Sequence, residues 1–263
     1  PPHPFFLFVF ALFFAIPVGA AETDWFWGAA TGEKLRFKVS WLGVPAGEVT
    51  LQLSGTPDGP YTAQASVATA GAVRVVHVLD EWRKAEGHRH DAVFAAQQYV
   101  SEQHKGAQTK WTSYLFDREM REVVRLRRET GRPDETRPIP LGNDQVGDPL
   151  SGFYALRAWP DLLPGHHLAR QVVDGEKVYC LAITAGGSRL LHTELGDFNV
   201  FSVQVVVENT ASFRQKQPIL VWLTDDARRI PVQVEAQLVL GSMVAELVAF
   251  EDGRGEHRAV PTQ

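Results

Sequence analysis

DPLSGFYALRAW, residues Asp148–Trp159, is the one stretch of this 263-residue chain whose apolar spacing is helical. Asp148 is a good N-cap, because its carboxylate can accept hydrogen bonds from the first turn. Proline is favourable at the next position, Pro149, because the backbone N–H that it lacks would have no partner in the first turn. One helical face carries Leu150, Phe153, Tyr154 and Arg157. This i, i+3, i+4, i+7 spacing predicts an amphipathic helix. A single short helix is not stable by itself, so we expect it to lie on a sheet.

The rest of the chain is typical of that sheet. Leu35, Phe37, Val39 and Trp41 alternate with polar residues, as in a half-buried strand. The predicted strands are 34–41, 49–53, 61–69, 73–83, 93–101, 109–116, 121–128, 167–173, 177–184, 188–195, 198–209, 219–224, 231–240 and 243–250. We expect turns at 43–47, 57–60, 88–91 and 174–175, and a long loop at 130–147. Short strands joined by tight turns predict a mainly β fold: a strongly curved, half-barrel-like antiparallel sheet wrapped around one short α-helix.

The first residues have the pattern of an export signal. Phe5–Ile16 is an unbroken apolar run, FFLFVFALFFAI, followed by small residues at Val18–Ala21. Its length suits a signal-peptide core and is short for a membrane span. We therefore expect a signal peptide at 1–21, a single β-rich domain at 22–263, and a periplasmic location close to a membrane. The alternative is a retained membrane anchor. Nothing after residue 21 is long and apolar enough to be a transmembrane segment.

The charge and the cysteine count exclude some kinds of partner and of covalent link. The formal net charge of −5 argues against nucleic acid. Cys180 is the only cysteine, so the chain forms no internal disulfide.

Several segments together resemble a known bacterial family. They are GEKLRFKVSWLGVPAGEVTL at Gly32–Leu51, the helix DPLSGFYALR at Asp148–Arg157, TELGDF at Thr193–Phe198, and VWLTDDARRIPVQVEAQLVLGSMVAEL at Val221–Leu247. In this order they are similar to the domain-of-unknown-function family 3108. The resemblance implies an exported envelope protein without an established activity, and it carries over no catalytic residue. At the level of fold, a sheet around one helix is also similar to the lipoprotein-carrier proteins of the outer-membrane localisation pathway.

Two motifs, one with histidines and one with adjacent aspartates, have residue types that can bind metal or catalyse acid/base chemistry. His88, His90 and Asp91 could contribute to a zinc site, but a fourth ligand is not evident, so we favour a solvated turn. Asp225 and Asp226 could serve acid/base catalysis, but adjacent aspartates also cap turns, and we favour that role. Neither a Gly-x-Ser-x-Gly elbow nor a phosphate-binding glycine motif occurs. We expect no enzyme activity, no metal and no cofactor.

An arginine-rich region has two interpretations. It contains Arg118, Arg121, Arg125, Arg127, Arg128, Arg132 and Arg137, interleaved with Glu119, Glu122, Glu129 and Glu135. The interleaving favours a solvated, salt-bridged face. The alternative is contact with an anionic headgroup or acidic glycan, because arginine suits phosphate.

The aromatic residues suggest a ligand. Trp41, Trp82, Trp111 and Trp222 fall in predicted strands, where tryptophan usually packs in a core. Alternatively, one helix covers only part of a concave sheet and leaves an apolar cleft. The candidate ligand-binding residues are Phe37, Val39, Trp41, Trp82, Trp111, Phe153, Tyr154 and Trp222. The sequence therefore favours a carrier for an apolar or amphipathic, lipid-like small molecule. The alternative is an envelope assembly or scaffolding protein that binds another protein.

Overall fold

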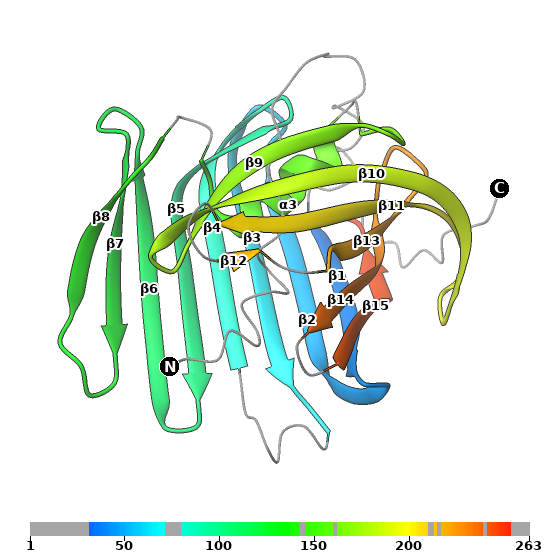
Figure 1. Ribbon diagram of the computed structural model, residues 1–263, viewed down its shortest axis with the longest axis horizontal. Coiled ribbons are helices and arrows are strands. Elements are labelled where there is room, and N and C mark those ends of the chain that lie inside the picture. The colour runs from blue at the N-terminus through cyan, green and yellow to red at the C-terminus, as the bar shows by residue number, and fades with distance from the viewer. Residues whose placement is uncertain are drawn as a thin grey trace.

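The computed structural model of the chain describes residues 32–71, 80–142, 146–159, 162–209, 213–214, 217–238 and 241–253. These ranges contain one helix, α3, and fifteen strands (Figure 1). The predicted signal peptide at 1–21 and the first part of the predicted strand 73–83 lie outside the described residues.

The strands follow one another closely along the chain. The first half contains β1 (Glu33–Trp41), β2 (Val44–Gly55), β3 (Gly59–Thr69), β4 (Asp80–His90), β5 (Val93–Lys105), β6 (Gln108–Asp117), β7 (Glu122–Glu129) and β8 (Glu135–Pro140). After α3 (Pro149–Ala158) come β9 (His167–Asp174), β10 (Lys177–Thr193), β11 (Gly196–Asn209), β12 (Phe213–Arg214), β13 (Ile219–Thr224), β14 (Pro231–Leu238) and β15 (Gly241–Glu251).

All fifteen strands belong to one antiparallel sheet. Its order is β8-β7-β6-β5-β4-β3-β2-β1-β15-β14-β13-β11-β10-β9, with β12 attached to β11. The first and last strands of the chain therefore pair in the middle of the sheet, and β8 and β9 are its two ends. Because these ends do not pair with each other in the described residues, the sheet is not closed. This confirms the predicted mainly β fold with one short helix.

The sheet bends so that its two halves face each other. In Figure 1, β9–β11 cross in front of the broad wall formed by β1–β8, and α3 lies between them. The helix packs against β3, β4 and β5 on one side and against β9 on the other. Leu35, Phe37 and Val39 of β1 point into the same buried core as the helix. The alternation read from the sequence therefore marks the concave face, called the inner face below.

The helix begins as predicted and is buried more completely than predicted. One carboxylate oxygen of Asp148 accepts from the backbone N–H groups of Leu150 and Ser151, both at 2.9 Å. All ten residues of α3, however, are buried. The predicted amphipathic character is wrong, because sheet covers the helix from both sides and not from one.

The last turn of the helix is tied to β1 by a buried ion pair. Arg157 donates to both carboxylate oxygens of Glu33, at 2.6 and 2.8 Å. It also donates to the backbone carbonyls of Arg228 and Arg229, at 3.2 and 2.9 Å. The exposed fractions of the paired side chains are 1% for Arg157 and 3% for Glu33. Burial acts to lower the pKa of Arg157, but the adjacent Glu33 carboxylate raises it overall.

Three predicted irregular segments are wrong in extent. Residues 88–90 continue β4, and the turn lies at Asp91-Ala92, where Asp91 has a positive φ of 51°. The predicted loop at 130–147 contains the edge strand β8, whose Pro138 and Pro140 concealed it from the pattern. The predicted turn at 43–47 shortens to two residues, because β2 begins at Val44.

One strand is longer than predicted. The expected strands 177–184 and 188–195 are a single strand, β10, of 17 residues. Its register against β11 shifts between Ala185 and Ser188. A bulge inserts residues without ending a strand, so Gly186-Gly187 bends β10 where a break was expected.

Candidate functional site

The inner face changes from apolar to polar along the sheet. Around α3 it is lined by one contiguous buried apolar cluster. Phe94, Phe116, Val123 and Ile139 of β5–β8 also face inward and belong to this cluster. Farther along the same face of β4–β8, three rows set by the strand register carry mostly charged, amide, hydroxyl and tyrosine groups. The first row holds Glu81, Gln103, Lys110 and Glu129; the second Arg83, Ser101, Thr112, Arg127 and Glu135; the third Ala85, Tyr99, Tyr114, Arg125 and Arg137. Directly opposite residues share a face, so these rows share the face of core residue Ala85.

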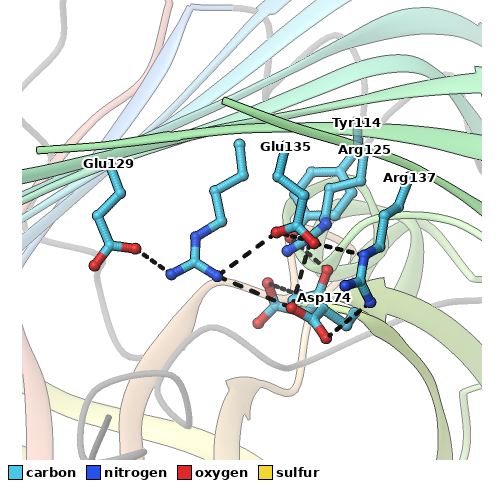
Figure 2. Close-up of polar contacts among 9 residues, drawn as sticks. Tyr114, Arg125, Glu129, Glu135, Arg137 and Asp174 are labelled. Carbon is cyan, nitrogen blue, oxygen red and sulfur yellow. Dashed lines mark hydrogen bonds and ion pairs between the residues drawn. The ribbon is translucent and has the colours of Figure 1, made fainter. Parts of the chain in front are cut away.

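A network of ion pairs joins five of these side chains to Glu176, and we call the six residues the inner-face ionic cluster: Arg125, Arg127, Glu129, Glu135, Arg137 and Glu176. Figure 2 shows it, with Arg125, Glu129, Glu135 and Arg137 labelled. Glu135 of β8 lies at its centre. Its carboxylate is 2.9 Å from Arg125 and 2.5 Å from Arg137, and 4.0 Å from Arg127. Arg127 also pairs with Glu129. For Glu129, partial burial acts to raise the pKa, but Arg127 lowers it overall.

The sixth member of the cluster comes from the opposite half of the sheet. Glu176 lies in the turn between β9 and β10, and its carboxylate is 3.4 Å from Arg125 and 3.9 Å from both Arg127 and Arg137. The hydroxyl of Tyr114 donates to the carbonyl of Gly175 in the same turn, at 3.2 Å. The β9–β10 turn is therefore hydrogen-bonded to β6 and lies close to β7 and β8, far from it in sequence.

A chain of buried polar contacts leads from this turn to β4. Tyr114 stacks on Tyr99, with ring centroids 5.5 Å apart. The Tyr99 hydroxyl accepts from Arg83 at 2.8 Å, and Arg83 donates to Glu81 at 2.6 Å. Burial raises the pKa of Tyr99 and of Tyr114. Both tyrosines therefore stay neutral and serve as hydrogen-bonding groups.

Some buried polar atoms beside the cluster lack a partner in the described part of the chain. They include Nε of Arg125 and one carboxylate oxygen of Asp174. The side chain of Arg125 is 2% exposed, and Asp174 as a whole residue is 6% exposed. Burial raises the pKa of Asp174, although Arg83 acts in the opposite direction. Burial, together with Arg127, lowers the pKa of Lys110. Unpartnered buried polar atoms are costly, so they mark a place where a further polar group would be favourable.

Half of the predicted ligand-binding residues lie in the core around α3. Phe37, Val39, Phe153 and Tyr154 are buried there, each with at most 9% of its surface exposed. Trp41 is partly buried and packs against the same cluster. These five side chains are brought together, but as packed core.

The other three tryptophans do not belong to the inner face. Trp82 is 38% exposed and, like Trp111, lies on the opposite face of its strand from the buried rows. Trp111 stacks with Arg128, whose guanidinium lies 5.1 Å from the ring centroid. Trp222 belongs to a second, smaller apolar cluster, with Arg189 at 3.6 Å over its ring. The expectation that Trp82, Trp111 and Trp222 line one concave cleft is therefore corrected.

The histidine and aspartate motifs are local contacts. His90 lies 3.0 Å from Asp58 across the neighbouring turn, and both are largely exposed. Asp226 accepts from the backbone N–H groups of Arg228 and Arg229 at 3.0 and 3.2 Å, as a turn-capping aspartate does. Within the described ranges, no three metal-binding side chains gather in one place.

The described residues also form a depression of about 190 Å³ at one end of β1–β3, lined by Gly32, Glu33, Lys34, Gln52, Leu53, Ser54, Thr62, Gln64 and Glu251. Most of these side chains are polar. It is therefore not the apolar cleft that the sequence suggested.

The polar rows were missed because the arginine-rich region was assigned to solvent. A usable signal was present in the strand at 121–128. Val123, Arg125 and Arg127 alternate with Val124 and Leu126, so apolar residues occupy both faces. In such a strand either set of alternating side chains can point inward. The sequence-based prediction places the arginines in solvent, whereas Arg125 and Arg127 point inward.

Comparison with known proteins agrees with the fold. The family model described as a protein of unknown function (DUF3108) matches residues 36–248, which confirms the resemblance predicted from the sequence. None of the curated proteins compared with the chain matches it. No helix in the described ranges has the length and apolarity needed to cross a membrane.

Among the solved structures compared with the chain, one has a similar fold. The chain is similar to a beta-barrel-like protein of the domain of unknown function DUF1849 from Brucella abortus, at 9% identity and a TM-score of 0.58, covering 85% of this chain and 98% of that one. A Bacteroides fragilis protein described as exported, with a YmcC-like fold, gives 8% identity, a TM-score of 0.32 and coverage of 84% and 96%. A Parabacteroides distasonis protein described as a lipoprotein gives 12% identity and a TM-score of 0.33, and the match covers 85% of this chain and 98% of that one.

Proposed function

We propose that this chain, which belongs to the DUF3108 family of proteins of unknown function, is a non-enzymatic binding module of the cell envelope. Its ligand would be amphipathic and lipid-like, and its binding surface would be the inner face of β5–β8. The location is inferred from the apolar run Phe5–Ile16. The periplasm is bounded by membranes, so lipid-like ligands are present in that compartment.

The polar rows on the inner face carry this proposal. Folded proteins seldom keep charged groups inside without use, because desolvation is costly. Here the rows continue directly from an apolar core, so one surface offers both apolar and charged contacts. In Figure 1, β6–β8 extend beyond α3 and beyond β9–β11. The members of the rows are partly exposed at Ser101, Lys110 and Arg127, which leaves them accessible to a ligand.

The geometry changes the site from the one expected. The apolar residues around α3 already pack against each other, so a ligand there would have to displace core. Phe37 is 3% exposed, and Phe37→Glu would test stability and not binding. The ligand-binding surface is therefore assigned to the polar rows beside the core.

A matched pair of bulky substitutions tests this assignment. Ser101 faces inward opposite Thr112, and its neighbour Val100 faces outward opposite Ser113; both are partly exposed. A fluorescent dodecanoyl probe should bind the wild-type protein saturably. Ser101→Trp should weaken that binding at least about five-fold, roughly 1 kcal/mol, and Val100→Trp should not. Absence of saturable binding to folded wild-type protein would exclude the proposal.

A second candidate, assembly with another envelope protein, is favoured by the edge strand β9. Beyond β10, β9 is covered by only one described bridge, between Gly147 and Val172. An uncovered strand edge can accept a strand from a partner. A cysteine placed at Ala169 on β9 should cross-link to such a partner. A cysteine placed at Thr136 on β8 is the control and should not.

A further inference from the structure

One carboxylate in the inner-face ionic cluster is held loosely by three arginines. Glu176 is 3.4–3.9 Å from the guanidinium groups of Arg125, Arg127 and Arg137. By contrast, the short contacts of Arg125 and Arg137, at 2.9 and 2.5 Å, go to Glu135. Charge-assisted hydrogen bonds from arginine are normally 2.7–2.9 Å long. Glu176 therefore lies among the arginines without making the bonds that they offer.

The exposure of Glu176 makes it easy to displace. Its side chain is 49% exposed, whereas that of Arg125 is 2% exposed. An ion pair that reaches solvent is weak, because water screens it. The side chain can swing out from the turn while Tyr114 keeps its hydrogen bond to Gly175. Removal of Glu176 from the cluster thus requires a rotation of one side chain and no opening of the sheet.

The cluster retains capacity for an additional acceptor. The Nε–H of Arg125 is buried and has no partner among the described residues. Arg137, at 60% exposure, forms the side open to solvent. With Glu176 swung out, three guanidinium groups would face two carboxylates, those of Glu135 and Glu129. Counted over the cluster members alone, the charge would then be positive by one unit; Arg132, 3.5 Å from Glu129, lies beside them.

We propose that the inner-face ionic cluster is a binding site for the anionic group of a ligand, and that Glu176 occupies it in the absence of ligand. The ligand group would be a phosphate or a phosphate ester, because guanidinium groups bind phosphate oxygens in bidentate fashion. The inference deepens the proposed function, on which it rests, by naming the charged end of the amphipathic ligand. Glu129 and Glu135 remain in place and limit the affinity, which suits a ligand that must be released.

Binding of three probes to the full-length protein tests the proposal. The probes are dodecyl phosphate, dodecyl maltoside and inorganic phosphate, each titrated below any micelle-forming concentration by calorimetry. Glu176→Gln should tighten binding of dodecyl phosphate about three- to five-fold, the effect of removing one competing exposed ion pair. Arg137→Gln should weaken it by about five-fold or more. Dodecyl maltoside should respond to neither variant.

Two control variants change the same charges on the outer face. Glu122→Gln alters a carboxylate at the first residue of β7. Arg128→Gln removes an arginine that is 58% exposed, close to the 60% of Arg137. Both should leave the affinity for dodecyl phosphate at the wild-type value. A change in Glu122→Gln as large as that in Glu176→Gln would refute the proposal, because overall charge would then account for the effect.

The remaining outcomes separate this site from the proposed function. If dodecyl phosphate binds the wild-type protein, unchanged or weaker binding to Glu176→Gln overturns the anion site. If both dodecyl probes still bind, the proposed carrier function stands. A third outcome is that neither dodecyl probe binds, while the affinity for inorganic phosphate rises in Glu176→Gln and falls in Arg137→Gln. The anion site then stands with free phosphate as its ligand, and the lipid-like ligand is excluded.

Discussion

The Glu33–Arg157 pair and the inner-face ionic cluster use the same two side-chain types on the same face of the same sheet. In the pair, Arg157 makes two hydrogen bonds to the Glu33 carboxylate, of 2.6 and 2.8 Å, and both side chains are buried. In the cluster, carboxylates compete for three arginines, distances reach 4.0 Å, and one nitrogen of Arg125 has no partner among the described residues. A satisfied pair fixes the helix on the sheet, whereas an incompletely satisfied cluster leaves room for a ligand.

The largest effect should come from breaking the satisfied pair. Arg157→Met leaves the buried Glu33 carboxylate without its partner, and we expect a loss of about 3–5 kcal/mol in the free energy of unfolding. Urea denaturation followed by tryptophan fluorescence measures it. The double variant Glu33→Met/Arg157→Met should recover a large part, because it removes the stranded charge. A loss below about 1 kcal/mol would mean that the two regions do not differ as described.

Removing a core side chain from the same helix should cost nearly as much. Phe153 packs edge-on against Tyr154, with ring centroids 5.1 Å apart, and 9% of its surface is exposed. Phe153→Ala should lower the free energy of unfolding by about 3 kcal/mol, the low end for an emptied aromatic site. A much smaller loss in the same urea assay would show that α3 is not a central packing element.

A smaller effect of opposite sign is expected beside the cluster. Because burial raises the pKa of Asp174, its ionised form weakens the folded state, and this loss is fully present above the folded-state pKa. Asp174→Asn should therefore stabilise the protein at pH 7, by about 1 kcal/mol. The advantage should shrink as the pH falls through the raised pKa and vanish below the ordinary value of 3.8. An advantage that is constant with pH would contradict this origin.

The smallest effect should be that of the loosest carboxylate. Glu176→Gln should change the free energy of unfolding by less than about 0.5 kcal/mol, because its ion pairs are long and half exposed. Thermal unfolding at low and high salt checks this. If the variant loses more than about 1 kcal/mol, Glu176 is a structural fastener like Glu33, and the two regions are alike.

Sequence patterns predicted the parts of this fold that local chemistry determines. Asp148 and Pro149 suit the N-cap and first position of the helix that follows them, and the alternation in β1 follows from a sheet with one buried face. The inward direction of Arg125 depends instead on how β7 is placed in register against Tyr114 of β6 and Arg137 of β8, and no local pattern contains that information. Trp82 illustrates the same limit, because its large ring suits an inner or an outer face.

The two prolines of β8 have a consequence for self-association. Pro138 and Pro140 are two residues apart, so their backbone nitrogens, which carry no hydrogen, turn the same way. This end of the open sheet is therefore a poor template for another strand, while β9 at the other end has no such block. Fibre growth by strand addition needs two competent ends on every molecule. With one end closed to it, any edge-to-edge pairing of two copies through β9 terminates at the dimer.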